Sequence, residues 1–256
     1  MTEVPRIAVL TVPTDHSWIL INALVERFGP VSVLAEERHG KLALIRRRMR
    51  RQGVLTVLGQ IGFVMLQKFI DRRQAPRIAE IVKDLALDTA PNPARHVYEI
   101  GSVNSMACRA ALAMISPHVV VVAGTRIIGR QTLESIGVPV INVHMGWNPR
   151  YRGQAGGYWA LAQGDPDHAG VTAHLVDDGV DTGAVLYRER FAATPQDSFG
   201  TYFYLQAGIG RSVLIRSVED ALAGRLKPVA ADGPSREFFH PTLWSYLWTA
   251  LRRGIW

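Results

Sequence analysis

The chain has little of what marks secreted, repetitive or membrane-spanning proteins. It contains one cysteine in 256 residues, which excludes an intramolecular disulfide framework. Its uninterrupted apolar runs are shorter than the roughly 20 residues that span a bilayer. The N-terminus lacks the basic-then-apolar order of a signal peptide, because residues 6–12 predict a short strand. We therefore expect a cytoplasmic globular protein.

Acidic residues are outnumbered. There are 22 Asp and Glu against 29 Lys and Arg, which gives a net charge of +7. Much of the excess lies in the arginine-rich run 46–51. A charge run is usually a solvated helix face, and no nucleic-acid-binding motif accompanies this one. We expect no nucleic-acid partner.

Alternating strand and helix patterns indicate an α/β protein. Apolar runs predict parallel strands near 7–12, 31–35, 119–123 and 138–143. Helices are predicted between them at 16–27, 76–86, 105–115 and 155–163. In the third of these helices Asn104 is the expected N-cap, and Cys108 is expected to be buried.

The segment from Val54 to Phe69 has the pattern of an amphipathic helix, inside an insert of about 41–70. Its apolar residues recur at helical spacing, at Val54, Leu55, Leu58, Ile61, Met65, Leu66 and Phe69. We expect this face to pack on the core or on a second subunit. The alternative is peripheral contact with anionic lipid, which the aromatic, Arg-ended segment 243–253 also favours.

The residues with most chemical meaning follow two predicted strands. Asn142 and His144 end a β-branched run, and residues two apart on a strand point the same way. The run 170–176 predicts the next strand, and the acidic, Gly-containing turn after it delivers Asp181. Ligands of open α/β sheets bind at the carboxyl ends of strands. We expect these three side chains to share one cleft suited to acyl transfer.

Each of these residues also has a structural explanation. A single histidine at a strand end is more often structural than catalytic, and an Asp-Gly turn is usually only a turn. For His174 the structural and catalytic roles are equally weighted. A metal site made by His144, His174, Asp177 and Asp181 matches no standard ligand spacing, so no metal is predicted.

An ordered set of motifs resembles the folate-dependent formyltransferase family. The set comprises 142–144, Pro149, 151–153, 159–161, 170–174 and 181–183, and extends back to 121–128. The resemblance covers about half the chain, roughly 119–222. It implies a Rossmann-like catalytic core over 1–200 with a mostly parallel sheet, followed by a helical extension over 201–256.

The resemblance also implies roles for individual residues. The formyl donor would be formyl-tetrahydrofolate. Asn142 would donate an N–H to the formyl oxygen, His144 would stabilise that oxygen or move protons, and Asp181 would orient His144 and accept the amine proton. The expected cofactor-binding residues are Gly124, Arg126, Ile127, Ile128, Val176, Asp177 and Gly179.

Two departures from the family pattern bear on the acceptor. Residues 145–149 replace the usual Ser-Leu-Leu-Pro type segment, and residues 12–16 replace the Gly-rich phosphate loop of the purine-pathway branch. About 55 residues follow the core, too few for the tRNA domain of methionyl-tRNA formyltransferases. The chain is thus most similar to sugar N-formyltransferases of surface polysaccharide synthesis, lipopolysaccharide included.

The expected acceptor is therefore a nucleotide-linked amino sugar. Arg150 and Arg152 are expected to hold its diphosphate, and Tyr158 or Trp159 to stack on its base. Other acceptors remain open: an amino acid or hydroxylamine of a siderophore pathway, or water in a formyl-tetrahydrofolate hydrolase. The non-enzymatic alternative is a basic membrane-peripheral or nucleic-acid-binding module.

Overall fold

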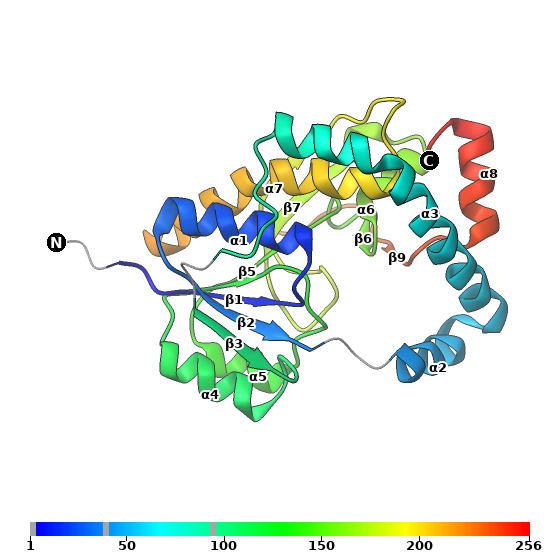
Figure 1. Cartoon of the computed structure of the whole chain (residues 1–256). Helices are drawn as coiled ribbons and strands as arrows, with labels where there is room; N and C mark the ends of the chain where they lie inside the picture. The colour runs from blue at the N-terminus through cyan, green and yellow to red at the C-terminus, as the bar shows by residue number, and fades with distance from the viewer. Residues whose placement is uncertain (1–3, 38–40, 93–95) are drawn as a thin grey trace.

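A seven-stranded sheet forms the centre of the computed structural model, which describes residues 4–37, 41–92 and 96–256 (Figure 1). Its strands are β1 (Ile7–Thr11), β2 (Ser32–Glu36), β3 (His96–Ile100), β4 (Val119–Val122), β5 (Val140–His144), β7 (Gly170–Leu175) and β8 (Val185–Arg190). The order is β3-β2-β1-β4-β5-β7-β8. Strands β1 to β5 are parallel to one another. Strand β7 runs antiparallel to β5, and β8 runs antiparallel to β7. The predicted Rossmann-like, mostly parallel sheet is confirmed.

Helices cover both faces of the sheet. Helices α1 (Asp15–Phe28) and α7 (Phe199–Leu222) lie on one face, and α4 (Met106–Ile115) and α5 (Arg130–Ile136) lie on the other (Figure 1). Successive strand residues alternate between the two cores because side chains on a strand point to opposite faces. Val9, Val121 and Ile141 belong to the core under α1 and α7, whereas Leu10, Val122 and Val140 belong to the other.

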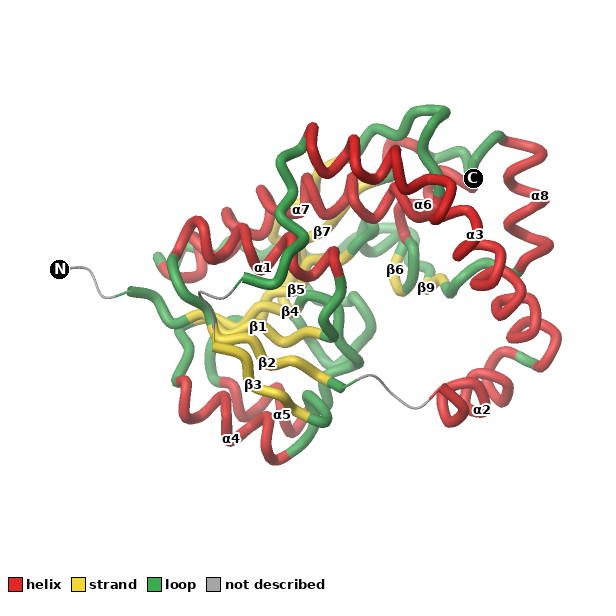
Figure 2. The backbone as a smooth tube through the Cα atoms, viewed as in Figure 1, coloured by secondary structure: helices red, strands yellow, loops and turns green. Residues whose placement is uncertain are grey.

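A third, aromatic core lies beyond the end of the sheet. It joins α3 (Val54–Asp84), α6 (Gly156–Ala162), α7 and α8 (Leu243–Arg253) through the buried rings of Phe63, Tyr158, Phe199 and Tyr246. Nearby are α2 (Lys41–Gln52), the short helix η1 (Pro166–His168), and a two-stranded sheet of β6 (Arg152–Gly153) and β9 (Glu237–Phe238). Figure 2 shows α2, the start of α3, and α8 gathered at one end of the molecule, away from the large sheet.

Several sequence-based boundaries change. The predicted helix 76–86 is the last part of α3, a single helix that continues through Pro76. Strands β3, β8, β6 and β9 were not predicted. Ser105, rather than Asn104, is the N-cap of α4, because its hydroxyl accepts the Cys108 N–H at 3.1 Å. Helix α7, which begins at the predicted boundary near residue 200, packs on the sheet through Val213, Leu214 and Val218.

The Val54–Phe69 helix does not turn the predicted face towards the core. Leu58 is 51% exposed and Met65 69% exposed, while Val57, Gln60, Phe63 and Gln67 are buried. The Gln60 side-chain N–H donates to the His240 carbonyl at 3.1 Å, and the Gln67 side-chain N–H donates to Asp71 at 2.6 Å. The helix has apolar residues on two sides, and the side that packs against the protein is the one that includes Gln60 and Gln67.

Candidate active site

The strand register brings four polar side chains together at the end of β5. Asn142 and His144 lie on the same side of β5, and Asn142 pairs directly across the strands with His174 of β7. Directly paired residues of antiparallel strands share a face, so His174 joins the two predicted residues. Asp181 arrives on the loop between β7 and β8, in a left-handed conformation with a φ of 53°.

Asn142 uses both amide hydrogens inside this cluster. Its Nδ2 lies 3.0 Å from His174 Nε2 and 3.2 Å from Asp181 Oδ1. His174 Nδ1 lies 2.7 Å from the Leu175 carbonyl and must donate to it, so in the neutral ring Nε2 is an acceptor. The His174 ring, the Asn142 amide and the Asp181 carboxylate therefore fix one another's orientation.

His144 is held between a backbone carbonyl and a carboxylate. Nε2 lies 2.9 Å from the Tyr151 carbonyl oxygen, which can only accept, so Nε2 carries a proton. Nδ1 faces Asp181 Oδ2 at 3.4 Å. The ring is 6% exposed, so both contacts are shielded from water.

Asp181 is set up to keep its negative charge. Burial opposes that charge, but the His144 and His174 rings and the Gly153 N–H outweigh burial and hold the pKa of Asp181 well below its usual value. The Gly153 N–H donates to Oδ2 at 2.9 Å. Gly153 belongs to β6, so the two-stranded sheet helps to position Asp181, which lies on the loop between β7 and β8.

The departure at 145–149 has a structural function. A Cβ at Gly146 would meet the Tyr151 carbonyl oxygen and His144 Nε2, so only glycine fits beneath the imidazole. The buried Thr172 hydroxyl fixes this loop, donating to the Gly146 carbonyl at 2.8 Å and accepting the Asn148 N–H at 3.0 Å. The loop also contains the cis Asn148–Pro149 bond. These residues form the floor under His144.

The predicted donor loop follows β4, next to the point where the strand order reverses between β1 and β4. Gly124 is exposed and has a positive φ, and its carbonyl accepts the Val12 N–H at 2.7 Å. Ile127 is exposed and Ile128 is buried in the core under α4 and α5. Only Ile127 therefore offers an apolar surface to a ligand here.

Glu36, at the end of β2, organises the same region and was missed by sequence reasoning. Its fully buried carboxylate forms an ion pair with Arg126 and accepts from the Thr125 hydroxyl at 2.6 Å and the Val103 N–H at 2.9 Å. Arg126, predicted to bind cofactor, is thus committed to a structural pair. The available signal was a glutamate at the carboxyl end of a predicted strand.

The acidic turn after β7 holds itself together. Asp177 Oδ1 accepts the Gly179 N–H at 3.1 Å and the Thr182 hydroxyl at 2.7 Å. Val176 donates its N–H to the Val140 carbonyl at 2.9 Å and packs on the core under α4 and α5. The turn that ends in Asp181 is therefore tied to β5 at its start.

The two predicted phosphate ligands have protein partners. Arg150 donates to Asp165 at 2.8 Å and contacts His168 at 3.1 Å, on the side of α6 and η1. Arg152 donates to the Val180 carbonyl at 2.6 Å and to the Ser235 hydroxyl at 2.8 Å. Arg152 is thus the one beside the Asp181 turn.

The prediction that Tyr158 stacks on a base is wrong in this structure. Its ring is 1% exposed and packs against Trp159, Phe199 and Tyr246. Trp159 remains partly exposed, but one face is stacked on Phe238 at 5.2 Å, and its Nε1–H donates to the Phe239 carbonyl. Two adjacent aromatic residues in a sequence do not show which of the two rings is buried in the aromatic core.

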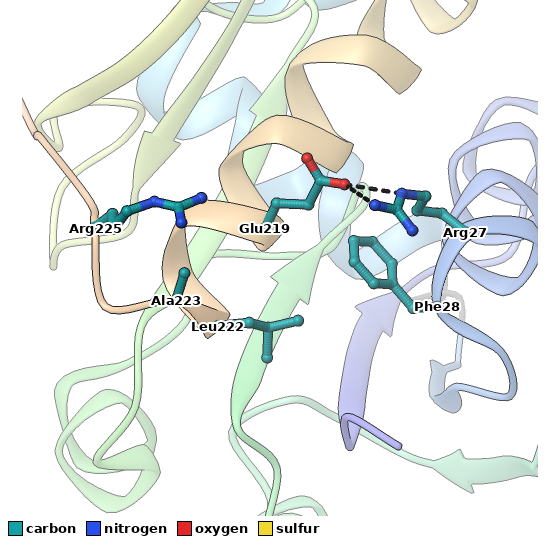
Figure 3. A pocket seen from close by; sticks show the side chains of 6 residues that line it. All are labelled: Arg27, Phe28, Glu219, Leu222, Ala223 and Arg225. Atoms are coloured by element: carbon teal, nitrogen blue, oxygen red, sulfur yellow. Dashed lines mark hydrogen bonds and ion pairs between the residues drawn. The ribbon is translucent and has the colours of Figure 1, made fainter. Parts of the chain in front are cut away.

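Other features of the described residues lie outside this cluster. No group of three or more His, Cys, Asp or Glu side chains in the described ranges is arranged to hold a metal ion. A surface hollow lies at the far ends of α1 and α7, crossed by the Arg27–Glu219 ion pair at 2.6 Å (Figure 3). Because α1 starts at the carboxyl edge and runs back, this hollow lies at the opposite edge of the sheet.

Residues 64–218 match the family described as Formyl transferase. A methionyl-tRNA formyltransferase of Desulfotalea psychrophila is 38% identical over 123 residues, which is 48% of this chain and 38% of that protein. The chain therefore matches less than half the length of that relative.

Solved structures share the fold across nearly the whole chain. A sugar N-formyltransferase from Shewanella sp FDAARGOS_354 covers 92% of this chain and 77% of its own, with a TM-score of 0.59 and 13% identity. An N-formyltransferase from Helicobacter canadensis, in complex with folinic acid and dTDP-3-aminofucose, covers 91% of this chain and 70% of its own, with a TM-score of 0.56 and 12% identity.

Proposed function

Because the chain belongs to the formyl transferase family, we propose that it moves a formyl group from formyl-tetrahydrofolate to the amine of a nucleotide-linked amino sugar. The observation that carries the proposal is that Asp181 lies 3.2 Å from Asn142 Nδ2 through one oxygen and 3.4 Å from His144 Nδ1 through the other. Formyl transfer needs an N–H donor for an oxyanion, a polar group that can stabilise that oxyanion or move protons, and a base for the amine proton. The cluster offers each of these.

In this proposal formyl-tetrahydrofolate supplies the activated one-carbon group. The acceptor amine forms a bond to the formyl carbon, the bond from that carbon to the folate nitrogen breaks, and the proton lost by the amine replaces the carbon on folate. Asn142 turns one N–H from Asp181 or His174 to the formyl oxygen as charge develops there. One such donor contributes roughly 3 kcal/mol to a transition state.

His144 and Asp181 have separate roles, at the formyl oxygen and at the amine proton. His144 stabilises the oxyanion or moves protons while its Nε2 stays anchored on the Tyr151 carbonyl. Asp181 accepts the amine proton directly or through water, as the only carboxylate in the cluster of Asn142, His144, His174 and Asp181. His174 acts as a positioning residue, because it contacts Asn142 and Asp181.

The donor pocket proposed for folate lies between the Gly124–Ile128 loop and the 176–179 turn. Exposed backbone at Gly124 and the exposed Ile127 side chain would contact the pterin ring. Arg126, Ile128, Val176 and Asp177 would act indirectly by shaping these two loops. Gly179 would add a backbone contact from the turn.

The sugar acceptor is supported by solved structures and by Arg152. The Helicobacter canadensis structure holds dTDP-3-aminofucose, a nucleotide-linked amino sugar. Arg152 follows β5 and contacts the loop that carries Asp181, so it is the proposed diphosphate ligand, with Arg150 more distant. The competing acceptor is methionyl-tRNA, because curated relatives 38% and 33% identical to this chain over about half its length carry the name methionyl-tRNA formyltransferase.

An acceptor panel tests the proposal. The full chain is incubated with formyl-tetrahydrofolate labelled in the formyl carbon and either nucleotide-linked amino sugars, methionyl-tRNA, hydroxylamines or water alone. We expect label in an amino sugar, detected by mass. Label in methionyl-tRNA alone would replace the acceptor but keep the enzyme class. No labelled product, together with no binding of reduced folate by calorimetry, would contradict the formyl-transfer proposal.

A further inference from the structure

Helices α3 and α8 expose far more apolar surface than their packing requires. The exposed side chains, here called the apolar end face, are Val54, Leu55, Leu58, Ile61, Val64, Met65, Phe69, Trp244, Leu247, Trp248 and Leu251. Leu55 is 76% exposed, Trp248 60% and Leu251 79%. Monomeric proteins rarely expose contiguous apolar patches of this kind unless the patch binds something.

The two helices form one continuous surface. The Trp244 ring lies directly over Gly59, where a Cβ would collide with it, and Leu243 contacts Gly62. Leu55 and Leu58, on the same side of α3, are thereby neighbours of α8. The opposite sides of both helices are already used, since Phe63 and Tyr246 pack together in the aromatic core with ring centroids 4.9 Å apart.

The surroundings of the apolar end face are mostly basic. Between residues 41 and 70 the sequence has seven basic residues and no acidic one, and residues 238–256 contain no acidic residue either, although Asp71 and Glu237 adjoin these ranges. Exposed cations flank the Val54–Phe69 part of α3, Arg50 and Arg51 before it and Arg72 and Arg73 after it. The Arg47 side chain lies outside the described residues. Arg252 closes α8, with its guanidinium 4.3 Å from the Trp248 ring centroid.

We propose that the apolar end face binds the surface of an anionic lipid bilayer. Exposed leucines, Phe69 and tryptophans would enter the boundary between headgroups and acyl chains, and the arginines would meet lipid phosphates. Tryptophan prefers that boundary because its ring is apolar with one polar N–H. This charge complementarity identifies lipid as the occupant.

A second copy of the chain fits the face less well. In a two-fold interface the same patch meets itself, so the basic residues of both copies would be brought together, and like charges across an interface are unfavourable. Crossing the bilayer also fits less well. Helix α3 has the length and apolar composition for it, but its buried side, including Gln60 and Gln67, packs inside the protein.

Vesicle flotation of the full chain tests the proposal. The probes are phosphatidylglycerol–phosphatidylcholine vesicles and vesicles of phosphatidylcholine alone, at low and high ionic strength. We expect binding to the anionic vesicles, weakened by salt because exposed charge interactions are screened. Binding should also shift the emission of Trp244 and Trp248 to shorter wavelength as their rings leave water, a readout that needs no substitution.

Variants locate the contact. Leu58→Asp and Trp248→Asp should each lower vesicle binding at least about tenfold, since each puts a charge in place of an apolar side chain that would enter the bilayer. Arg50→Gln, which leaves the apolar residues intact, should lower binding to anionic vesicles and reduce its salt dependence. The matched control is Met114→Asp, an equally exposed apolar site on α4, 67% exposed, which should bind as the unchanged protein does.

Three results would overturn the proposal. One is no vesicle binding at low salt by the folded protein. Another is equal loss of binding in the Met114→Asp control. The third is a stable dimer in sedimentation velocity that Leu58→Asp converts to a folded monomer, which would assign the apolar end face to a second copy of the chain.

Discussion

His144 Nδ1 faces Asp181 Oδ2 at 3.4 Å while the other nitrogen of the same ring is anchored on a backbone carbonyl. The ring therefore has one fixed contact and one that can change during a reaction. A separation of 3.4 Å is longer than a good hydrogen bond, and catalytic contacts often shorten only when substrate binds. This relationship makes the position of the imidazole, and the charge of Asp181, the properties to test.

The floor of the site should tolerate no side chain at Gly146. Gly146→Ala places a methyl group against His144 Nε2 and the Tyr151 carbonyl, so the ring must move. We expect formyl transfer to fall about a hundredfold, as small misplacements of catalytic groups do. Reduced folate should still bind by calorimetry. Gly101→Ala, where an added Cβ meets nothing within 4 Å, is the control and should leave turnover unchanged.

Glu36 should support folate binding from beneath the donor loop. Glu36→Gln removes the carboxylate that holds Arg126 and Thr125, leaving a partly buried guanidinium with a weaker partner. We expect reduced-folate affinity to fall about tenfold, with thermal stability also lower. The exposed neighbour Glu37→Gln serves as control. Equal folate affinity in both variants would contradict a role for Glu36 in shaping the loop.

Stability should depend on pH through His240. Burial, with a smaller contribution from the nearby Arg48 charge, lowers the pKa of His240 to about 4 from 6.5. Between these values the unfolded chain binds more protons, so the stabilisation is complete above pH 6.5 and lost as pH falls towards 4. The full loss is roughly 3 kcal/mol.

Urea unfolding at pH 7.5, 6 and 5 measures this effect. The pKa of His16 is also lowered, so the wild type is compared with His240→Phe, which keeps a ring beside Phe63 and Phe199. The variant should lose less stability between pH 7.5 and 5. Identical losses in the two proteins would show that His240 is not the group responsible.

Sequence patterns predicted the central strands well because buried parallel strands are nearly continuous β-branched runs. Val119–Val122 and Val140–His144 are examples, with every residue of the first buried. Strand β3 was missed because it is an edge strand whose residues are mostly exposed, so its hydrophobic pattern is weak. The placement of Asn142 and His144 followed directly from the strand they end.

The sequence could not predict the register between β5 and β7, or which of the two apolar sides of α3 is buried. The pairing of Asn142 with His174 depends on which residues of β5 and β7 lie opposite each other. The orientation of α3 depended on a choice between two apolar sides, and the aromatic core took the side containing Phe63. Tyr158 was likewise drawn into that core by neighbours from α7 and α8 that are distant in sequence.

We propose that Asp181, kept charged beside His144, serves formyl transfer. Its pKa is held well below the usual value, so the acid limb of the pH–rate profile above pH 4 should arise elsewhere. The most direct measurement is the single-turnover rate of labelled formyl transfer in Asp181→Asn, against the exposed control Asp178→Asn from the same loop. We predict a loss of about a hundredfold or more for Asp181→Asn, with folate affinity retained, and no loss for the control. Equal rates in the two variants would contradict the account.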